Sequence, residues 1–130
     1  MKTKETDWND LLHHEPHEVR FEDSVIHVED NVFTPDPERT NSTSIIIDHL
    51  PSVSGLRVAD VGTGTGAIAI VVAHRGAREV VATDVSEAAI RNARTNVATN
   101  NVGTKVHVII TNLLNEITGK FDIICANLPI

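Results

Sequence analysis

The stretch DVGTGTGA, residues 60–67, constrains the fold of this 130-residue chain more than any other feature. An apolar segment, LRVADV (56–61), leads into it, and a second apolar segment, AIAIVVAHR (67–75), leads out of it. Glycines let a backbone turn tightly and approach a ligand closely, as they do between a strand and a helix of an α/β domain. We therefore predict a strand over 56–61, a ligand-binding turn, and a helix over 67–75.

The order of strand, turn and helix continues toward the C-terminus. Further apolar strands are predicted over EVVATD (79–84), KVHVII (105–110) and FDIICA (121–126). Near-continuous apolar strands that alternate with helices indicate an α/β fold, with a mostly parallel sheet covered on both faces. Right-handed crossovers make such a sheet doubly wound, as in Rossmann-like folds.

A helix is predicted between the strands at 79–84 and 105–110. Ser86 is suited to cap its start, and Glu87 places an acid in its first turn. Small and apolar residues at helical spacing form its predicted buried side: Ala89, Ile90, Ala93 and Val97.

Upstream of this unit, residues 1–17 form a polar segment, and residues 18–130 are treated as one domain. Alternating apolar residues on either side of the turn-prone Glu22-Asp23-Ser24 predict a hairpin over 18–29. Asp36-Pro37 then predicts the start of a helix. The predicted buried face of that helix consists of Ile45, Ile46 and Leu50.

Composition and charge argue against several classes of function. No apolar run approaches the roughly 18 residues of a membrane span, and the N-terminus lacks a signal peptide's apolar segment, so we expect a cytoplasmic location. His13 and His17 are separated by the helix-breaking Pro16, so no metal site is expected. The net charge of −7 and the lack of a basic stripe favour a protein partner over nucleic acid. The single Cys125, in an apolar run, is interpreted as a core thiol.

Two cofactors fit the glycine-rich turn. Gly62, Gly64 and Ala67 satisfy the dinucleotide fingerprint G-x-G-x-x-A, so an NAD-dependent oxidoreductase is one alternative. A dinucleotide places its pyrophosphate at such a turn, and the Asp60 carboxylate would repel it. S-adenosylmethionine carries a cationic sulfonium and an ammonium instead, and both favour a nearby acid. The sequence therefore favours S-adenosylmethionine.

Polar residues follow each of the other predicted strands. Asp84 ends the strand at 79–84, at the spacing of about 20 residues at which an acid binds the cofactor's ribose. The alternative for Asp84 is a place at the flank of the next helix. Asn112-Leu113 follow the strand at 105–110 and could meet an adenine edge, although Asn112 could equally bond its own loop backbone.

Asn127-Leu128-Pro129 follow the strand at 121–126. The side-chain oxygen of an asparagine and a neighbouring carbonyl, fixed in direction by a proline, can together accept both hydrogens of a planar N–H2 group. The nitrogen lone pair would then point toward an electrophilic methyl, and charge that builds on the nitrogen would be stabilised. This pattern predicts a clamp for a methyl acceptor.

Three stretches, RVADVGTGTGAIAI, VVATDVSEAAIRNARTN and GKFDIICANLPI, together resemble class I S-adenosylmethionine-dependent methyltransferases. The resemblance runs from about Val32 to Ile130 and is strongest to the small-domain group that contains the release-factor glutamine N5-methyltransferases. The ribosomal-protein methyltransferases are the second-best match. NVFTPDPERTNST resembles the segment that precedes the cofactor fold in the first group and lines its pocket.

The resemblance implies a role for each motif residue. Asp60, Gly62, Thr63, Gly64 and Gly66 would hold the methionine part of the cofactor, Asp84 its ribose, Val85 the adenine face, and Asn112 and Leu113 the adenine edge. Asn127 and the Leu128 carbonyl, fixed by Pro129, would hold the acceptor nitrogen.

The chain also departs from the family's pattern. The family usually reads Asn-Pro-Pro-Tyr where this chain has Leu128 and Ile130, which removes an aromatic surface for a planar acceptor, and Asn112 stands where an aspartate is common. The family's sheet has seven strands, so we expect this sheet to lack its C-terminal strands and FDIICA to expose an apolar edge.

Three hypotheses follow. The first is methyl transfer to a planar nitrogen, such as a glutamine-like amide of a protein, by a form that binds the cofactor without efficient turnover. The second is a non-enzymatic cofactor-fold module that pairs its exposed strand with another copy or a partner chain. The third is an NAD-dependent oxidoreductase.

Overall fold

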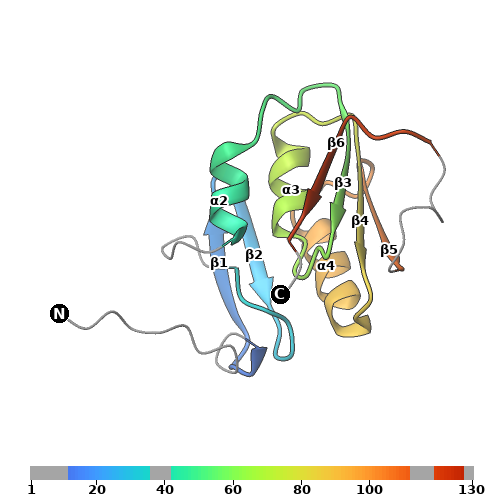
Figure 1. Cartoon of the computed structure of the whole chain (residues 1–130). Coiled ribbons are helices and arrows are strands. Elements are labelled where there is room, and N and C mark those ends of the chain that lie inside the picture. The colour runs from blue at the N-terminus through green and yellow to red at the C-terminus, as the bar shows by residue number, and fades with distance from the viewer. Residues whose placement is uncertain (1–11, 36–41, 112–118, 128–130) are drawn as a thin grey trace.

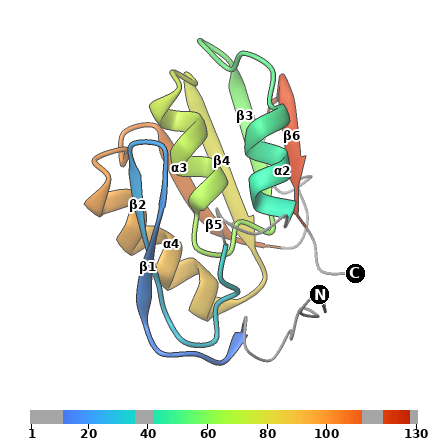
Figure 2. The same cartoon turned by 90° about the vertical axis from the view of Figure 1, so that its left-hand side faces the viewer.

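The computed structural model describes residues 12–35, 42–111 and 119–127. Over these ranges the chain forms a four-stranded parallel sheet and a two-stranded antiparallel hairpin, with helices packed between them (Figure 1). Seen from the side of the hairpin, the two hairpin strands lie in front of the helix at 87–99, the helix at 42–49 lies to one side of them, and the sheet lies behind (Figure 2). The hairpin therefore forms an outer layer over the helical layer.

The sheet and its helices have the order that the sequence predicts. The elements are β3 (Arg57–Val61), α3 (Ala67–His74), β4 (Glu79–Asp84), α4 (Glu87–Thr99), β5 (Val106–Ile110) and β6 (Ile123–Ala126). The strand order is β5-β4-β3-β6, and every pairing is parallel. The chain moves outward from β3 through β4 to β5 and then returns to the other side of β3. This reversal of direction is the topology of a doubly wound sheet, and the predicted fold class is confirmed.

The register of the strands separates two faces of the sheet. Val58 is paired with Val80 and Ile123, and Val80 with Val106, so these four side chains point to the same face. All four belong to or pack against the hydrophobic core under α3 and α4. The core of the domain therefore lies between this face of the sheet and the helices.

The opposite face of the sheet differs from the sequence-based expectation. Near-continuous apolar strands predicted helices on both faces, but α2 (Ser42–His49), α3 and α4 all lie on the same side (Figure 1). Ile109 and Ile124 point away from these helices and are 37% and 57% exposed. The apolar residues that gave rise to the prediction are present, but the described helices do not cover them. β6 is an edge strand within the described ranges, as expected for FDIICA.

Helix α2 (Ser42–His49) packs against α3 with a different face from the one predicted. Ile47 is 4% exposed, whereas Ile45 is 45% exposed, so the prediction for Ile45 was wrong. Ile46 and Leu50 do pack against the core. Positions 43, 46, 47 and 50 follow the i, i+3, i+4, i+7 spacing of one helical stripe, and Ile45 lies off that stripe. The predicted helix start at Asp36-Pro37 falls outside the described residues.

The predicted hairpin is confirmed as β1 (His17–Phe21) and β2 (Ser24–Val28). Two asparagines of α4 and the asparagine that follows it as its C-cap, spaced four residues apart, bind the edge of β2 that does not pair with β1. Their side-chain oxygens accept hydrogen bonds from the backbone N–H groups of every second residue: Asn92 from Glu29 at 2.9 Å, Asn96 from His27 at 2.9 Å and Asn100 from Val25 at 3.2 Å. We call these three residues the asparagine ladder.

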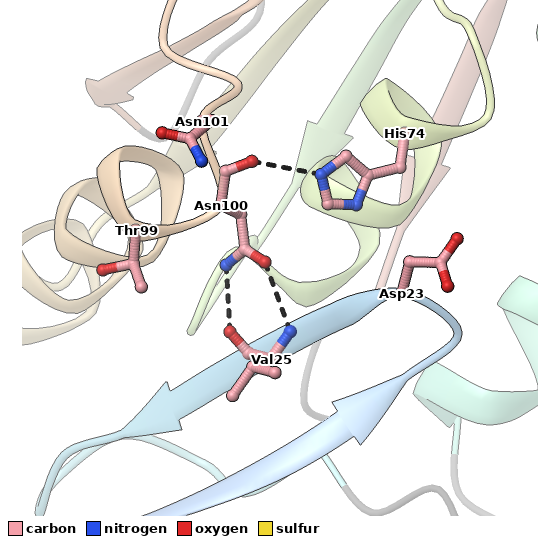
Figure 3. A pocket seen from close by; sticks show the side chains of 6 residues that line it. All are labelled: Asp23, Val25, His74, Thr99, Asn100 and Asn101. Atoms are coloured by element: carbon pink, nitrogen blue, oxygen red, sulfur yellow. Dashed lines mark hydrogen bonds between the residues drawn. The ribbon is translucent and has the colours of Figure 1, made fainter.

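The side-chain N–H groups of the asparagine ladder bind the carbonyls of the same strand. Asn92 and Asn96 each donate to His27 O at 2.8 Å, and Asn100 donates to Val25 O at 2.9 Å (Figure 3). A strand edge leaves backbone groups that need partners when they are buried, and here side chains supply them in place of a neighbouring strand. Asn92 and Asn96 are 2% and 0% exposed. The ladder therefore fixes the hairpin in register along α4.

We predict that Asn92→Ala lowers the free energy of unfolding by about 2 kcal/mol, because the Glu29 N–H and the His27 carbonyl both lose their hydrogen bonds with this buried side chain. Thr95→Ala, on the exposed side of the same helix, is the matched control and is expected to change the value by less than about 0.5 kcal/mol. Urea unfolding followed by circular dichroism measures both. Equal losses in the two variants would show that the ladder does not stabilise the fold.

Candidate functional site

The turn between β3 and α3 is built from glycines in the left-handed region. Gly62, Gly64 and Gly66 have φ values of 74°, 57° and 86°. At Gly66 a Cβ atom would lie 3.3 Å from the Cβ of Ala93 in α4, so a larger residue would collide with a packed helix as well as strain the backbone. We call residues 62–66 the glycine loop. The positive φ values of this loop require glycine at the positions that the sequence analysis selected.

The end of β4 holds the glycine loop from one side. The N–H groups of Gly62 and Thr63 donate to the carbonyl of Thr83 at 2.9 and 2.8 Å. Gly64 N–H donates to the Oδ2 atom of Asp84 at 2.9 Å. Oδ1 of Asp84 accepts from the N–H of Ser86 at 3.0 Å. Asp84 thus joins the glycine loop to the start of α4.

Asp84 is suited to both roles that the sequence left open. It flanks α4, where Ser86 is the cap and accepts from the Ala89 N–H at 3.2 Å, as predicted. Its side chain is also partly exposed, and each carboxylate oxygen can accept more than one hydrogen bond. Val85, beside it, is 67% exposed and available for a flat apolar contact. Ribose binding by Asp84 and adenine packing on Val85 remain predictions.

Asp60 lies differently from the position that we expected for an acid facing a cationic cofactor. It is 1% exposed and points to the helix-covered face, because it shares that face with Val58. Its Oδ2 accepts a hydrogen bond from the Thr63 hydroxyl at 2.7 Å, whereas Oδ1 has no partner in the described part of the chain. Asp60 therefore ties the end of β3 to the glycine loop and keeps one buried acceptor atom.

Burial dominates the electrostatics around Asp60. It raises the pKa of the Asp60 carboxyl from 3.8 to about 6, against the Thr63 hydrogen bond, which lowers it. Burial, helped by the charge of Asp60, also raises the pKa of the neighbouring Cys125 thiol to about 11. This thiol is 6% exposed and belongs to the core cluster, in agreement with the interpretation as a core residue.

Asn127 directly follows β6 and reaches the same edge of the sheet. Its backbone N–H donates to the carbonyl of Val61 at 3.3 Å. Its side-chain Nδ2 donates to the hydroxyl of Thr43 in α2 at 3.0 Å. Thr43 is 8% exposed, and the sequence analysis did not identify it as a site residue, although it lies in the NVFTPDPERTNST segment. Thr43 leaves the side-chain oxygen of Asn127 to accept a hydrogen bond from another group.

The register brings three of the predicted motifs together. Val61 is paired with Thr83 on one side and Ala126 on the other, and each pair lies just before a motif residue. Gly62, Asp84 and Asn127 therefore follow the same row across β3, β4 and β6. This row lies at the carboxyl ends of the strands and beside the reversal of strand order, where open α/β sheets bind ligands. The predicted Asn112, Leu113, Leu128 and Pro129 fall outside the described residues.

A hollow of about 470 Å³ lies elsewhere, among Asp23, Val25, His74, Thr99, Asn100 and Asn101 (Figure 3). It is at the C-terminal ends of α3 and α4, and therefore at the opposite edge of the sheet from the glycine loop. His74 bonds the Ser24 hydroxyl at 2.7 Å and the Asn100 carbonyl at 3.1 Å, which holds the hairpin turn to both helices. This hollow is separate from the candidate site.

Within residues 12–35, 42–111 and 119–127, no three histidine, cysteine, aspartate or glutamate side chains are grouped as metal ligands would be. None of the described helices is long and apolar enough to cross a membrane.

We predict that the unfolding free energy carries a pH dependence from Asp60. Because the folded pKa is raised to about 6, the neutral carboxyl stabilises the fold below 3.8, and this contribution of up to about 3 kcal/mol is lost as the pH rises through 6. Asp60→Asn, which stays neutral, should be less stable relative to wild type at pH 4 than at pH 7. Urea unfolding at both pH values measures the difference, and an unchanged difference would contradict the prediction.

The chain is similar to proteins of one known family. The model of the family described as "Methyltransferase small domain" matches residues 24–130. A ribosomal protein L11 methyltransferase from Desulforamulus reducens is 39% identical over 89 residues, which are 67% of this chain and 29% of that protein. A candidate protein N5-glutamine methyltransferase from Methanocaldococcus jannaschii is 33% identical over 92 residues, which are 71% of this chain and 46% of that protein.

One solved structure illustrates the similarity of the fold. The ribosomal protein L11 methylase from Lactobacillus delbrueckii subsp. bulgaricus has a TM-score of 0.56 and 31% identity, over 76% of this chain and 50% of that chain. The chain thus spans half or less of the length of these three proteins.

Proposed function

This chain belongs to the methyltransferase small domain family, and we propose that it transfers a methyl group from S-adenosylmethionine to a planar nitrogen of a protein substrate. Membership confirms the resemblance to S-adenosylmethionine-dependent methyltransferases that the sequence showed, and with it the predicted cofactor. It favours this cofactor over the dinucleotide of the NAD-dependent alternative. We also propose that this form binds the cofactor without efficient turnover.

One observation carries the proposal: the glycine loop, Asp84 and Asn127 meet at one edge of the sheet. The residues present fit the cofactor. The loop offers backbone without side chains at its glycines, Asp84 offers carboxylate oxygens to ribose hydroxyls, and the exposed Val85 offers an apolar surface to a base. S-adenosylmethionine, when bound, supplies an electrophilic methyl group next to a positive sulfur.

The part proposed for Asn127 is to hold and orient the acceptor. Its Nδ2 is occupied by the Thr43 hydroxyl, so Oδ1 is the atom that can accept a hydrogen from the substrate. We propose that the Leu128 carbonyl, restricted by Pro129, accepts the second hydrogen of an N–H2 group. A nitrogen held by both hydrogens presents its lone pair in a fixed direction, which lowers the entropic part of the barrier.

A protein is the favoured acceptor. The two curated relatives described above are named for protein substrates, ribosomal protein L11 and glutamine in protein. The net charge of −7 also disfavours a polyanion such as RNA. A glutamine-like amide has the planar N–H2 group that the proposed Asn127 and Leu128 acceptors require.

The cofactor proposal predicts that the wild-type protein binds S-adenosylhomocysteine in a calorimetric titration. Asp84→Ala should weaken this binding at least about tenfold, since it removes the ribose acceptor and an anchor of the glycine loop. Asp23→Ala, in the hairpin turn at the opposite edge of the sheet, is the matched control and should bind as wild type does. Lack of wild-type binding at millimolar ligand would overturn the proposal for this form.

The acceptor proposal predicts that Asn127→Ala retains S-adenosylhomocysteine binding but lowers the rate of methyl transfer about 100-fold. Removal of one oriented polar group from a reacting centre has an effect of this size. Transfer of a labelled methyl group is measured to a glutamine-containing peptide, a lysine-containing peptide and an RNA oligonucleotide. Labelling of RNA in preference to both peptides would overturn the choice of a protein acceptor. Labelling of lysine in preference to glutamine would overturn the amide.

The edge strand β6 supports a second candidate function, a non-enzymatic module that pairs with another copy of the chain. β6 is bonded to β3 on one side, and Ile124 on it is 57% exposed. An unpaired apolar edge is a surface on which a further strand can add. Gel filtration of the chain decides this candidate, because a monomer at high concentration contradicts self-pairing.

A further inference from the structure

Asn96 makes contacts that its neighbours in the asparagine ladder do not make. It is 0% exposed, and its Oδ1 accepts from His27 N–H at 2.9 Å. One hydrogen of Nδ2 bonds His27 O at 2.8 Å, and the other bonds the carbonyl of Thr65, in the glycine loop, at 2.9 Å. Within residues 12–35, 42–111 and 119–127, Asn92 bonds the backbone of β2 and of the residue after it. Of the asparagine ladder, Asn96 is the residue that connects the hairpin, α4 and the glycine loop in these ranges.

The bond to Thr65 fixes one peptide group of the loop. The carbonyl of this peptide is held by Asn96, and its N–H, which belongs to Gly66, donates to the Thr63 carbonyl at 2.9 Å. Gly64 and Gly66 stand on either side of Thr65, and both have positive φ values. The backbone rotates more freely at a glycine than at any other residue. This peptide rotates about ψ of Thr65 and φ of Gly66, so a glycine loosens one of its two torsions, and its hydrogen bonds contribute to holding its direction.

Helix α4 meets the loop at two places one turn apart. Ala93 packs against Gly66, where a Cβ atom would approach to 3.3 Å, and Asn96 binds Thr65. On the other side, the end of β4 holds Gly62, Thr63 and Gly64. The loop is thus held between β4 and α4. Asn96 supplies the hydrogen bond between α4 and the loop.

We propose that Asn96 is a positioning residue for cofactor binding, which it supports by fixing the Thr65-Gly66 peptide in the binding conformation without touching the cofactor. This rests on the proposed function, since it assumes that the glycine loop binds S-adenosylmethionine. Without the Asn96 amide the peptide rotates in the free protein, and binding has to order it again. Ordering a flexible segment on binding costs affinity.

The test compares Asn96→Ala with Asn92→Ala, because both variants remove hydrogen bonds to the hairpin and only the first releases Thr65. Asn96→Ala should raise the dissociation constant for S-adenosylhomocysteine about tenfold, which corresponds to about 1.4 kcal/mol, and Asn92→Ala less than about threefold. Asn96→Ser, a smaller change, is measured in the same way and takes the place of Asn96→Ala if that variant does not fold. Equal changes for Asn96 and Asn92 variants would overturn the proposal.

Amide hydrogen exchange at Gly66 gives a second measurement that does not depend on the cofactor. Its N–H bond to Thr63 should open more often in the Asn96 variants, with exchange about tenfold faster, and stay near the wild-type rate in Asn92→Ala. Unchanged exchange in the Asn96 variants would overturn the positioning role. If wild-type protein fails to bind S-adenosylhomocysteine, the proposed function falls, and the exchange rates still decide whether Asn96 orders the loop.

Discussion

The outer edge of β2 is the constraint on which the arrangement of this domain depends. A hairpin that lies on helices rather than beside a sheet has backbone N–H and C=O groups that must find partners away from water. Here the asparagine ladder at α4 and its C-cap provides them, and its spacing of four residues matches every second residue from Val25 to Glu29. This match sets the hairpin in one register. It also requires polar side chains on a buried helix face, which is stable because the amides are hydrogen-bonded.

The two acids near the glycine loop have separate roles that follow from strand geometry. Asp60 lies one residue before the end of β3 and points under α3, so its carboxylate binds the loop from within the core. Asp84 ends β4 and is partly exposed, so it binds the loop and still faces the carboxyl edge of the sheet. The D-x-G-x-G-x-G pattern is therefore explained in part by support of the loop. Of the two carboxylates, Asp84 is the one that is partly exposed, and ligand binding by it stays a prediction.

Most of the fold follows from the sequence, because apolar periodicity and glycine turns are local signals. The strand at 79–84, the Ser86 cap and the hairpin all lie where those signals place them. The errors concern properties that depend on distant residues. The burial of Asn92 and Asn96 depends on a strand more than 60 residues earlier in the chain, so a helix analysis that counts apolar residues misses it. Repetition of asparagine every four residues was the available signal.

The site divides in the same way. A glycine-rich turn and an acid at a strand end are local features, and the sequence located both. The contact between Asn127 and Thr43 joins residues 84 positions apart, and it forms only because β6 lies beside β3 with α2 near its end. A local pattern cannot supply such a pair. The same holds for the direction of Asp60, which depends on which face of the sheet the helices cover.

Because of the position of β6, the rigidity of the candidate acceptor site depends on the part of the sheet that the described helices leave uncovered. β6 has four residues and, among the strands that the structure describes, pairs with β3 alone, and Asn127 follows it directly. Its backbone is held by one bond to Val61, and its side chain by one bond to Thr43. A strand bonded on one side opens more easily than one bonded on both. A chain that covers Ile124 or adds a strand beside β6 would therefore also hold Asn127 in place. Covering the apolar edge of the sheet would thus fix the position of the proposed acceptor-binding residue as well.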